Sequence, residues 1–300
     1  MSGFPLEVRT ASTCHDVGLD TVWSWAYPDP STGKSREIDV VATKHAHAPP
    51  SIHPELGGSL TLHFLIECKR ADGLVIFRSH PNEIIQDRHY FDSVYQGSPK
   101  HVWPGEERGV FGNRIPVSGW LEIGSLFWPW PDVVGAQYAF LSRRDKQRRN
   151  GGFKVADQGT YSRLQGLQAA VEALPTMRGS DVKIPSKEHW RPMDMNLVVP
   201  LVVVDAPIFS YDITSDSKTS PVNHAALSLT EWSSERWVQL RVDVVRESHL
   251  RQFLDATLNN FEELAARVME HAGLFQRAQE LEAEARRKQP ASPADTKDAT

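Results

Sequence analysis

The residues best suited to chemistry are an acid in one apolar run of the chain and an acid and a lysine in the next. Asp39 lies in the first run, and Glu67 and Lys69 lie two residues apart at the end of the second. Because side chains alternate between the faces of a strand, Glu67 and Lys69 share a face, and Cys68 between them points to the opposite, apolar one. If the two runs pair as a hairpin, Asp39 comes alongside Glu67, so two carboxylates and one ammonium meet.

Two adjacent carboxylates favour a divalent cation. They repel each other and resist joint ionisation, and a cation removes that penalty. Ligation by oxygen atoms alone suits Mg²⁺, which takes one or two carboxylates, keeps several waters and leaves room for phosphate oxygens. The pattern therefore predicts a site for Mg²⁺, or for Mn²⁺ in its place, at Asp39 and Glu67.

An Asp on one strand followed by Glu-x-Lys on the next resembles the PD-(D/E)xK nuclease superfamily, whose members share the restriction-endonuclease-like fold. The matching residues are Asp39 and Glu67-Cys68-Lys69, and the resemblance covers roughly residues 1–80 well and the rest more loosely. It implies Mg²⁺-dependent hydrolysis of DNA phosphodiester bonds, with Asp39, Glu67 and the backbone carbonyl of Cys68 as metal ligands. It also implies that Lys69 orients the attacking water or stabilises charge that develops on phosphorus.

Two further acids are candidates for the same site. Residues 5–17 have the apolar periodicity of an amphipathic helix, with Glu7 in its first turn. Many members of the superfamily carry a glutamate on the first helix that points toward the metal, and Glu7 matches it; the alternative is an acid that only complements the helix dipole. Glu37 shares the strand face of the motif acid and would join a second metal or pair with Arg36 or Lys34.

One segment concentrates positive charge in a chain whose net charge is −5. The overall sign does not favour bulk attraction to nucleic acid, but affinity for a duplex depends on local Lys and Arg residues that displace counterions. Five such residues precede a Gly-Gly pair and predict a mobile loop that contacts DNA phosphates, with a solvated surface turn as the alternative. They are Arg143, Arg144, Lys146, Arg148 and Arg149.

Several other residues have both a functional and a structural interpretation. His45, His47 and His53 lie in a predicted Pro-rich loop between the motif strands, where they form either a zinc site or part of a solvated loop. The aromatic residues at 127–131 predict either a platform on which bases stack or the packing of an irregular segment. His63 shares the face of the motif and would support a metal ligand or contact the substrate.

The elements that position these residues form an α/β domain. The expected order is helix, three strands, insertion, helix and two strands, which is the order expected of a restriction-endonuclease-like core with a mixed sheet flanked by helices. A long C-terminal helix is expected to follow. The predicted strands are residues 22–27, 36–42, 60–69, 74–78, 196–208 and 237–245, and the predicted helices are residues 5–17, 158–174 and 248–287.

The chain divides into five regions by composition. Residues 1–79 are the N-terminal part of the nuclease core with the metal site, 80–157 an insertion rich in aromatic residues, Pro and Gly that contains the basic loop, 158–247 the C-terminal part of the core, 248–288 the C-terminal helix, and 289–300 a disordered tail. The last part of the helix, from residue 276, is almost uniformly polar and is expected to project into solvent.

Composition indicates the class of protein. The chain is 40% apolar and 24% charged, as in soluble globular proteins, and it has no apolar run long enough to span a bilayer and no signal-peptide pattern at its start. We therefore expect a cytoplasmic protein that does not bind membranes. Cys14 and Cys68 fall on apolar faces, which predicts buried thiols rather than a disulfide or a thiolate metal site.

The expected function is a Mg²⁺-dependent endonuclease that acts on DNA, in bacterial restriction, phage defence or repair. The alternative is a catalytically inactive protein that keeps the nuclease fold as a nucleic-acid-binding or scaffolding subunit. The expected partners are DNA and either a second copy of the chain or another protein that targets the nuclease.

Overall fold

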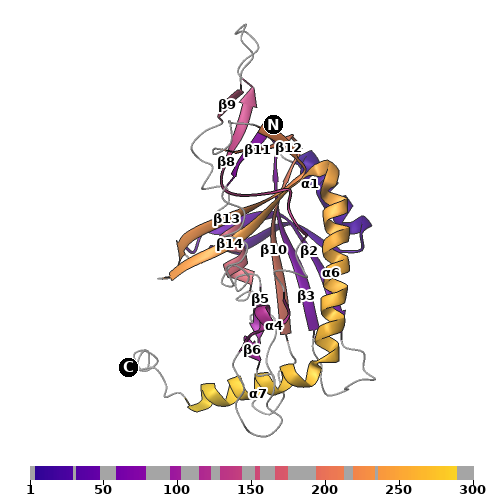
Figure 1. Ribbon diagram of the computed structural model, residues 1–300, viewed down its shortest axis with the longest axis vertical. Helices are drawn as coiled ribbons and strands as arrows, with labels where there is room; N and C mark the ends of the chain where they lie inside the picture. Colours follow the sequence, from indigo (N-terminus) through magenta and orange to yellow (C-terminus); the bar gives the residue numbers. More distant parts are fainter. Residues whose placement is uncertain are drawn as a thin grey trace.

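One large mixed β-sheet organises the protein, as seen in a computed structural model (Figure 1). The structure describes residues 4–29, 32–47, 59–78, 95–102, 115–122, 129–143, 153–155, 166–174, 194–212, 219–233 and 236–288. The strands are β1 (Asp20–Pro28), β2 (Ser35–His47), β3 (Ser59–Lys69), β4 (Gly73–Arg78), β5 (Tyr95–Ser98), β8 (Val133–Arg143), β9 (Phe153–Val155), β10 (Asp194–Val204), β11 (Ile208–Tyr211), β12 (Thr219–Val222), β13 (His224–Ser233) and β14 (Arg236–Arg246).

The strand order explains how the N-terminal hairpins join the rest of the sheet. The order is β1-β2-β3-β10-β14-β13-β8-β4-β11-β12, with β5 paired to β10 and β9 paired to β8. Strand β2 is antiparallel to both β1 and β3, whereas β10 runs parallel to both β3 and β14. The prediction of an α/β fold with a mixed sheet flanked by helices is confirmed. A second, small sheet pairs β6 (His101–Val102) with β7 (Ile115–Pro116).

The sheet curves strongly at the ends of β3 and β10. Four strands lie between β3 and β4 in the hydrogen-bonded order, yet only residues 70–72 connect them along the chain. Strand β10 turns into β11 in the same way, and β11 pairs with β4 in parallel. Arg70 Nε donates a hydrogen bond of 3.0 Å to Asp205 Oδ2, which links the two turns.

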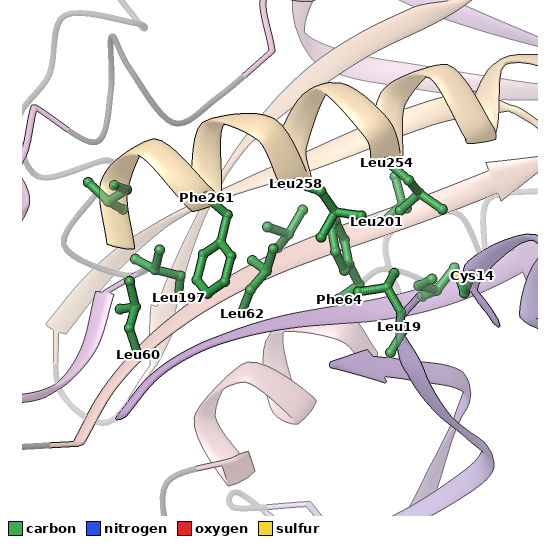
Figure 2. Close-up of a cluster of buried hydrophobic side chains, with 14 of the residues drawn as sticks. Cys14, Leu19, Leu60, Leu62, Phe64, Leu197, Leu201, Leu254, Leu258 and Phe261 are labelled. Carbon is green, nitrogen blue, oxygen red and sulfur yellow. The ribbon is translucent and has the colours of Figure 1, made fainter. Parts of the chain in front are cut away.

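Helices cover both faces of the sheet around β3 and β10. Helix α1 (Phe4–Asp16) and the long helix α6 (Leu250–Glu270) pack on one face, and a helix at residues 166–174 packs on the other. Figure 2 shows the first of these cores, in which α6 places its apolar side chains against β3 and β10. The apolar face predicted for β3 is confirmed, because these residues are all buried in this core: Leu60, Leu62, Phe64, Ile66 and Cys68.

The long C-terminal helix is present and is divided at His271 into α6 and α7 (Ala272–Lys288). Figure 1 shows α7 running across the end of α6. The short helix α4 (Val117–Trp120) explains the division of the helix. The ring of Trp120 packs edge-on against both His271 and Phe275, and the chain changes direction around this ring. The last part of the helix, from residue 276, was expected to project into solvent, but Glu282 in this part accepts hydrogen bonds from two backbone N–H groups, at residues 100 and 101.

Two stretches differ from the expected element pattern. Strand β2 continues to His47, so the predicted loop at residues 43–59 begins later, because β2 pairs with β3 over its whole second half. The segment expected to be an insertion supplies β8, which lies between β13 and β4 in the main sheet. Pairing with neighbours that are distant in sequence gives β8 and β13 strand structure that their own patterns did not predict.

Both cysteines lie where the apolar pattern predicted them. Cys14 and Cys68 are buried free thiols, as predicted. Burial raises the pKa of each thiol to about 12, so neither is a thiolate at neutral pH. Of the helices in the described part of the chain, none has the length and apolar character needed to cross a membrane.

Candidate functional site

The motif acid Asp39 lies where β2 and β3 separate. The two strands pair from His47 and Ser59 as far as Val40 and Ile66. Beyond this point the backbone N–H of Cys68 donates a hydrogen bond of 2.7 Å to Asp39 Oδ2. The carboxylate thus accepts a bond that a strand carbonyl would otherwise take, and this charge-assisted contact holds Asp39 at the start of the Glu-x-Lys segment.

The backbone around Asp39 departs from regular strand geometry. Strict alternation would place Ile38 and Val40 on one face, but Ile38 packs in the core beneath the helix at 166–174 and Val40 packs in the core beneath α6. On the neighbouring strand β1, Ser24 lies opposite Asp39 and has a φ of 50°. A positive φ is costly for a residue with a side chain, and such residues cluster at functional sites.

Glu67 and Lys69 are in direct contact, which confirms that they share a face. Lys69 Nζ donates to Glu67 Oε2, and the side chains are 21% and 8% exposed respectively. Burial raises the pKa of the Glu67 carboxyl, the Lys69 ammonium opposes this, and the charges of Asp39 and Glu7 raise the pKa further. The carboxylate is therefore buried, surrounded by other acids, and balanced in part by one lysine.

Glu7 approaches the same cluster from α1. The helix packs on β1, β2 and β3 through buried residues that include Leu6 and Thr10, and Thr10 Oγ1 lies 3.5 Å from the Sγ of Cys68. Partial burial raises the pKa of Glu7, and the nearby charges of Asp39 and Glu37 add to the effect. The charges of Glu7, Asp39 and Glu67 therefore act on one another, and the role of Glu7 stays a prediction.

Tyr27 and Gly166 form a wall of the site that the sequence pattern did not predict. The Oη of Tyr27 donates a hydrogen bond of 2.6 Å to the carbonyl of Gly166, at the start of the described part of that helix. A Cβ at Gly166 would lie 3.8 Å from Glu67 Oε1 and 3.9 Å from Tyr27 Oη. Burial raises the pKa of Tyr27 to about 12, so it remains a donor, and Trp25 stacks on its ring at 5.5 Å.

Three arginines lie beside the site residues along the chain, and the sequence pattern singled out Arg36 alone, as one of two partners for Glu37. Arg9 donates to both carboxylate oxygens of Glu247, which begins the short 3-10 helix η2 (Glu247–His249). Arg70 pairs with Asp205. Arg36 pairs with the buried Asp29, which directly follows β1. The sequence pattern offered Arg36 and Lys34 as partners of Glu37, so Arg36 is paired, but with a different acid.

The predicted basic loop cannot be placed relative to the site. Arg143 is the last residue of β8, and its side chain is not among those described. Arg144, Lys146, Arg148 and Arg149 lie outside the described residues. The phosphate-contacting role of this loop therefore stays a prediction, as does the role of the aromatic segment, of which residues 129–131 alone are described.

Of the three histidines predicted to lie in the loop, two lie on strand β2 instead. His45 lies on β2, where its Nδ1 is 3.1 Å from Thr61 Oγ1. His53 and the side chain of His47 are not described. His63 is buried, and its Nε2 lies 3.2 Å from Asn196 Oδ1 on β10, so it links two strands of the sheet instead of facing solvent at the site.

The donor set fits Mg²⁺ in a limited sense. Within the described ranges, no three His, Cys, Asp or Glu side chains are grouped closely enough to hold a metal ion by themselves. Mg²⁺ requires only one or two carboxylates and completes its shell with water, and Asp39 and Glu67 meet that smaller requirement. Repulsion from Asp39 contributes to the raised pKa of both Glu7 and Glu67, and a cation would relieve this repulsion.

No family model matches the chain, and neither does any curated protein or any solved structure. Function must therefore be inferred from the residues themselves.

Proposed function

We propose that the protein is a magnesium-dependent endonuclease with a restriction-endonuclease-like core that hydrolyses phosphodiester bonds in DNA. The observation that carries this proposal is the meeting of Asp39, Glu67 and Lys69 where β2 and β3 separate. The order of α1, β1, β2, β3, the helix at 166–174 and β10 along the chain also agrees with the resemblance. Such an enzyme would act in the cytoplasm, in restriction, phage defence or repair.

Asp39 and Glu67, together with the backbone carbonyl of Cys68, would hold the cation. When bound, Mg²⁺ would polarise the phosphate ester and offset the negative charge that builds up on it. The Cys68 N–H bond to Asp39 leaves the second oxygen of that carboxylate as the atom for this purpose. Mn²⁺, which also binds oxygen ligands, would replace Mg²⁺.

The remaining steps fall to the side chains. Lys69 is the more exposed member of its ion pair, so its ammonium can turn from Glu67 toward a phosphoryl oxygen and stabilise charge there. Glu7 is a partly buried carboxylate whose pKa is raised, which makes it a better proton acceptor than an exposed acid, and it would take a proton from the attacking water. Tyr27 would hold the helix at 166–174 against Glu67 and so limit access of bulk water.

A catalytically inactive nuclease-fold protein is the second candidate, and one observation favours it. The contact between Lys69 and Glu67 is what a residual structural ion pair would look like, since it neutralises a buried carboxylate without a metal. In that case the protein would bind nucleic acid or serve as a scaffold.

Plasmid cleavage decides between the two. We expect the protein to nick supercoiled plasmid in Mg²⁺ or Mn²⁺ and to be inactive in EDTA, and we expect Asp39→Asn and Lys69→Ala to lose the activity. Lys44→Ala is the matched control, because Lys44 lies on β2 and its Nζ donates to the backbone carbonyl of Gly18, at 3.5 Å. If no metal supports nicking, or if Lys69→Ala cleaves as fast as the parent, the enzymatic proposal is wrong and the scaffold remains.

A further inference from the structure

Three half-exposed arginines are carried by the same elements as the candidate site residues. Arg9 follows Glu7 by two positions on α1, Arg36 precedes Asp39 by three positions on β2, and Arg70 directly follows Lys69. Their side chains are 53%, 37% and 45% exposed. Arginine forks with this exposure are available to an anion that approaches the site.

Contacts of neighbouring residues place these arginines near the site. Arg9 precedes Thr10, whose Oγ1 lies 3.5 Å from the Sγ of Cys68, and Arg36 is the strand partner of Tyr27. The electrostatic interactions agree with this placement. The pKa of Arg9 is raised by Glu247 first, and more weakly by Asp205, which is the acid paired with Arg70. Arg9 and Arg70 therefore lie near the same carboxylate. The charges of Arg36 and Glu67 both act on the pKa of Tyr27, so the third arginine lies across the site on the Tyr27 side.

Each of the three guanidinium groups is held by an acid from a different element. Arg9 binds Glu247 of η2 with two nitrogens, Nη2 at 3.1 Å from Oε2, so its fork already faces a pair of oxygens. Arg36 binds Asp29, whose other oxygen accepts the N–H of Thr32 and which is therefore fixed. Such tertiary pairs differ from the exposed pairs within single helices, which are Arg251 with Asp255 and Arg277 with Glu280.

We propose that Arg9, Arg36 and Arg70 bind the phosphates of a DNA duplex around the candidate site, and that their carboxylate partners occupy the guanidinium forks when DNA is absent. The proposal rests on the proposed function, and it names the residues that would dock its substrate. A guanidinium fork matches the oxygens of a carboxylate and of a phosphate equally well.

Exchange of a carboxylate for a phosphate is easiest at Arg9 and Arg70. Exposed ion pairs contribute little to stability, so the pairs of these two arginines are readily given up. Arg36 keeps the buried Asp29 at its Nε and would meet a phosphate with its other N–H groups. A phosphate contact also releases condensed counterions from the duplex, which a carboxylate partner cannot do. Local arginines can therefore bind DNA although the net charge of the chain is −5.

The test compares Arg9→Gln, Arg36→Gln and Arg70→Gln with a matched control. Arg78→Gln is that control, because Arg78 is 46% exposed and paired with Asp212 at 3.7 Å, but lies at the end of β4 away from the Arg70 turn. Affinity for a short labelled DNA duplex is measured by fluorescence anisotropy over a series of salt concentrations in EDTA. Each site variant should reduce the slope of log K against log salt by about one, and Arg78→Gln should leave it unchanged.

The acid partners provide a second measurement in the opposite direction. Glu247→Gln and Asp205→Asn remove the carboxylate partners of Arg9 and Arg70. Both variants should bind the duplex more tightly. Any increase in the rate of plasmid nicking should be no larger than the increase in affinity. Thermal unfolding of every variant identifies any that fail to fold. A site variant that fails to fold is left out, and the surface is then judged on the remaining site variants and on Glu247→Gln and Asp205→Asn.

The outcomes separate this inference from the proposed function. Equal slopes for the three site variants and Arg78→Gln, or no affinity of the parent for the duplex, overturn the arginine surface even if plasmid is nicked. Reduced slopes without nicking in any metal support the surface and reject the nuclease.

Discussion

Two clusters of ionisable residues lie on the sheet, and they differ in how completely their charges are satisfied. The closed cluster is on β13 and β14, where the fully buried Asp243 receives bonds from Arg241 and from His224 Nε2, the latter at 2.7 Å. Arg241 also donates to the carbonyl of Pro129, and the His224 ring packs against Phe253 of α6 at 4.9 Å. The open cluster is the site on β2 and β3, where the buried carboxylate of Glu67 has one lysine beside it.

The pKa values of the two buried acids shift in opposite directions. Burial alone would raise the pKa of Asp243, but Arg241 and His224 outweigh it and lower the pKa. At Glu67 the same effect of burial prevails, because a single lysine does not compensate for burial and for the neighbouring acids. A satisfied network of this kind is structural, whereas a buried acid with a raised pKa next to other acids marks a candidate site.

The largest expected effect is on stability at the closed cluster. Asp243→Asn would leave the buried Arg241 without its counter-charge, and we expect the free energy of unfolding to fall by about 3–5 kcal/mol, measured by urea denaturation. Glu67→Gln is the comparison, and we expect it to leave stability unchanged or raise it, because the raised pKa shows that the charged form is disfavoured. A small loss for Asp243→Asn would mean that the two clusters do not differ as described.

The next effect is on catalysis at the open cluster. Glu67→Gln should lower the rate of plasmid nicking at least 100-fold, about 2.7 kcal/mol of transition-state stabilisation, because the amide is a poor ligand for a divalent cation. Arg241→Lys should leave the rate per folded molecule unchanged, as it is part of the closed cluster. Equal losses of rate for the two variants would show that both clusters act in the reaction.

A smaller effect is expected at the wall of the open cluster. Tyr27→Phe removes one hydrogen bond, the 2.6 Å bond to the Gly166 carbonyl, and should cost about 0.5–1.5 kcal/mol of unfolding free energy. Because the helix at 166–174 then loses its tie next to Glu67, nicking should slow more than the stability loss alone predicts. An unchanged rate for folded Tyr27→Phe protein would reduce this wall to a structural contact.

The smallest effect is the pH dependence of stability, which should have opposite signs at the two acids. The folded protein binds a proton at Glu67 more tightly than the unfolded chain, so this residue makes stability fall as pH rises above 4.5, the ordinary pKa of a glutamate. Asp243 has a lowered pKa, so its contribution is present above 3.8 and is lost as pH falls below that value. Urea denaturation at a series of pH values checks both slopes. Glu67→Gln should reduce the first slope alone, and the remainder comes from Glu7, whose pKa is also raised.

Local periodicity predicted the parts of the fold that depend on neighbouring residues. The apolar face of β3, the hairpin of β2 with β3 and the shared face of Glu67 and Lys69 follow from alternation within one strand. The closed cluster could not be predicted in this way, because His224 and Asp243 meet only when β13 and β14 pair. The same applies to β8, whose place in the sheet depends on β13 and β4.

By itself, the sequence determined the apolar face of β3, the burial of both cysteines and the shared face of Glu67 and Lys69. It did not determine the faces on β2, where Ile38 and Val40 pack in different cores. The tertiary structure alone decided the partners. Asp39 binds the Cys68 N–H because β2 and β3 separate there, Tyr27 reaches a carbonyl 139 residues away, and the Arg9 fork meets an acid 238 residues away. Contacts over such separations depend on strand order and helix packing, which no local pattern encodes.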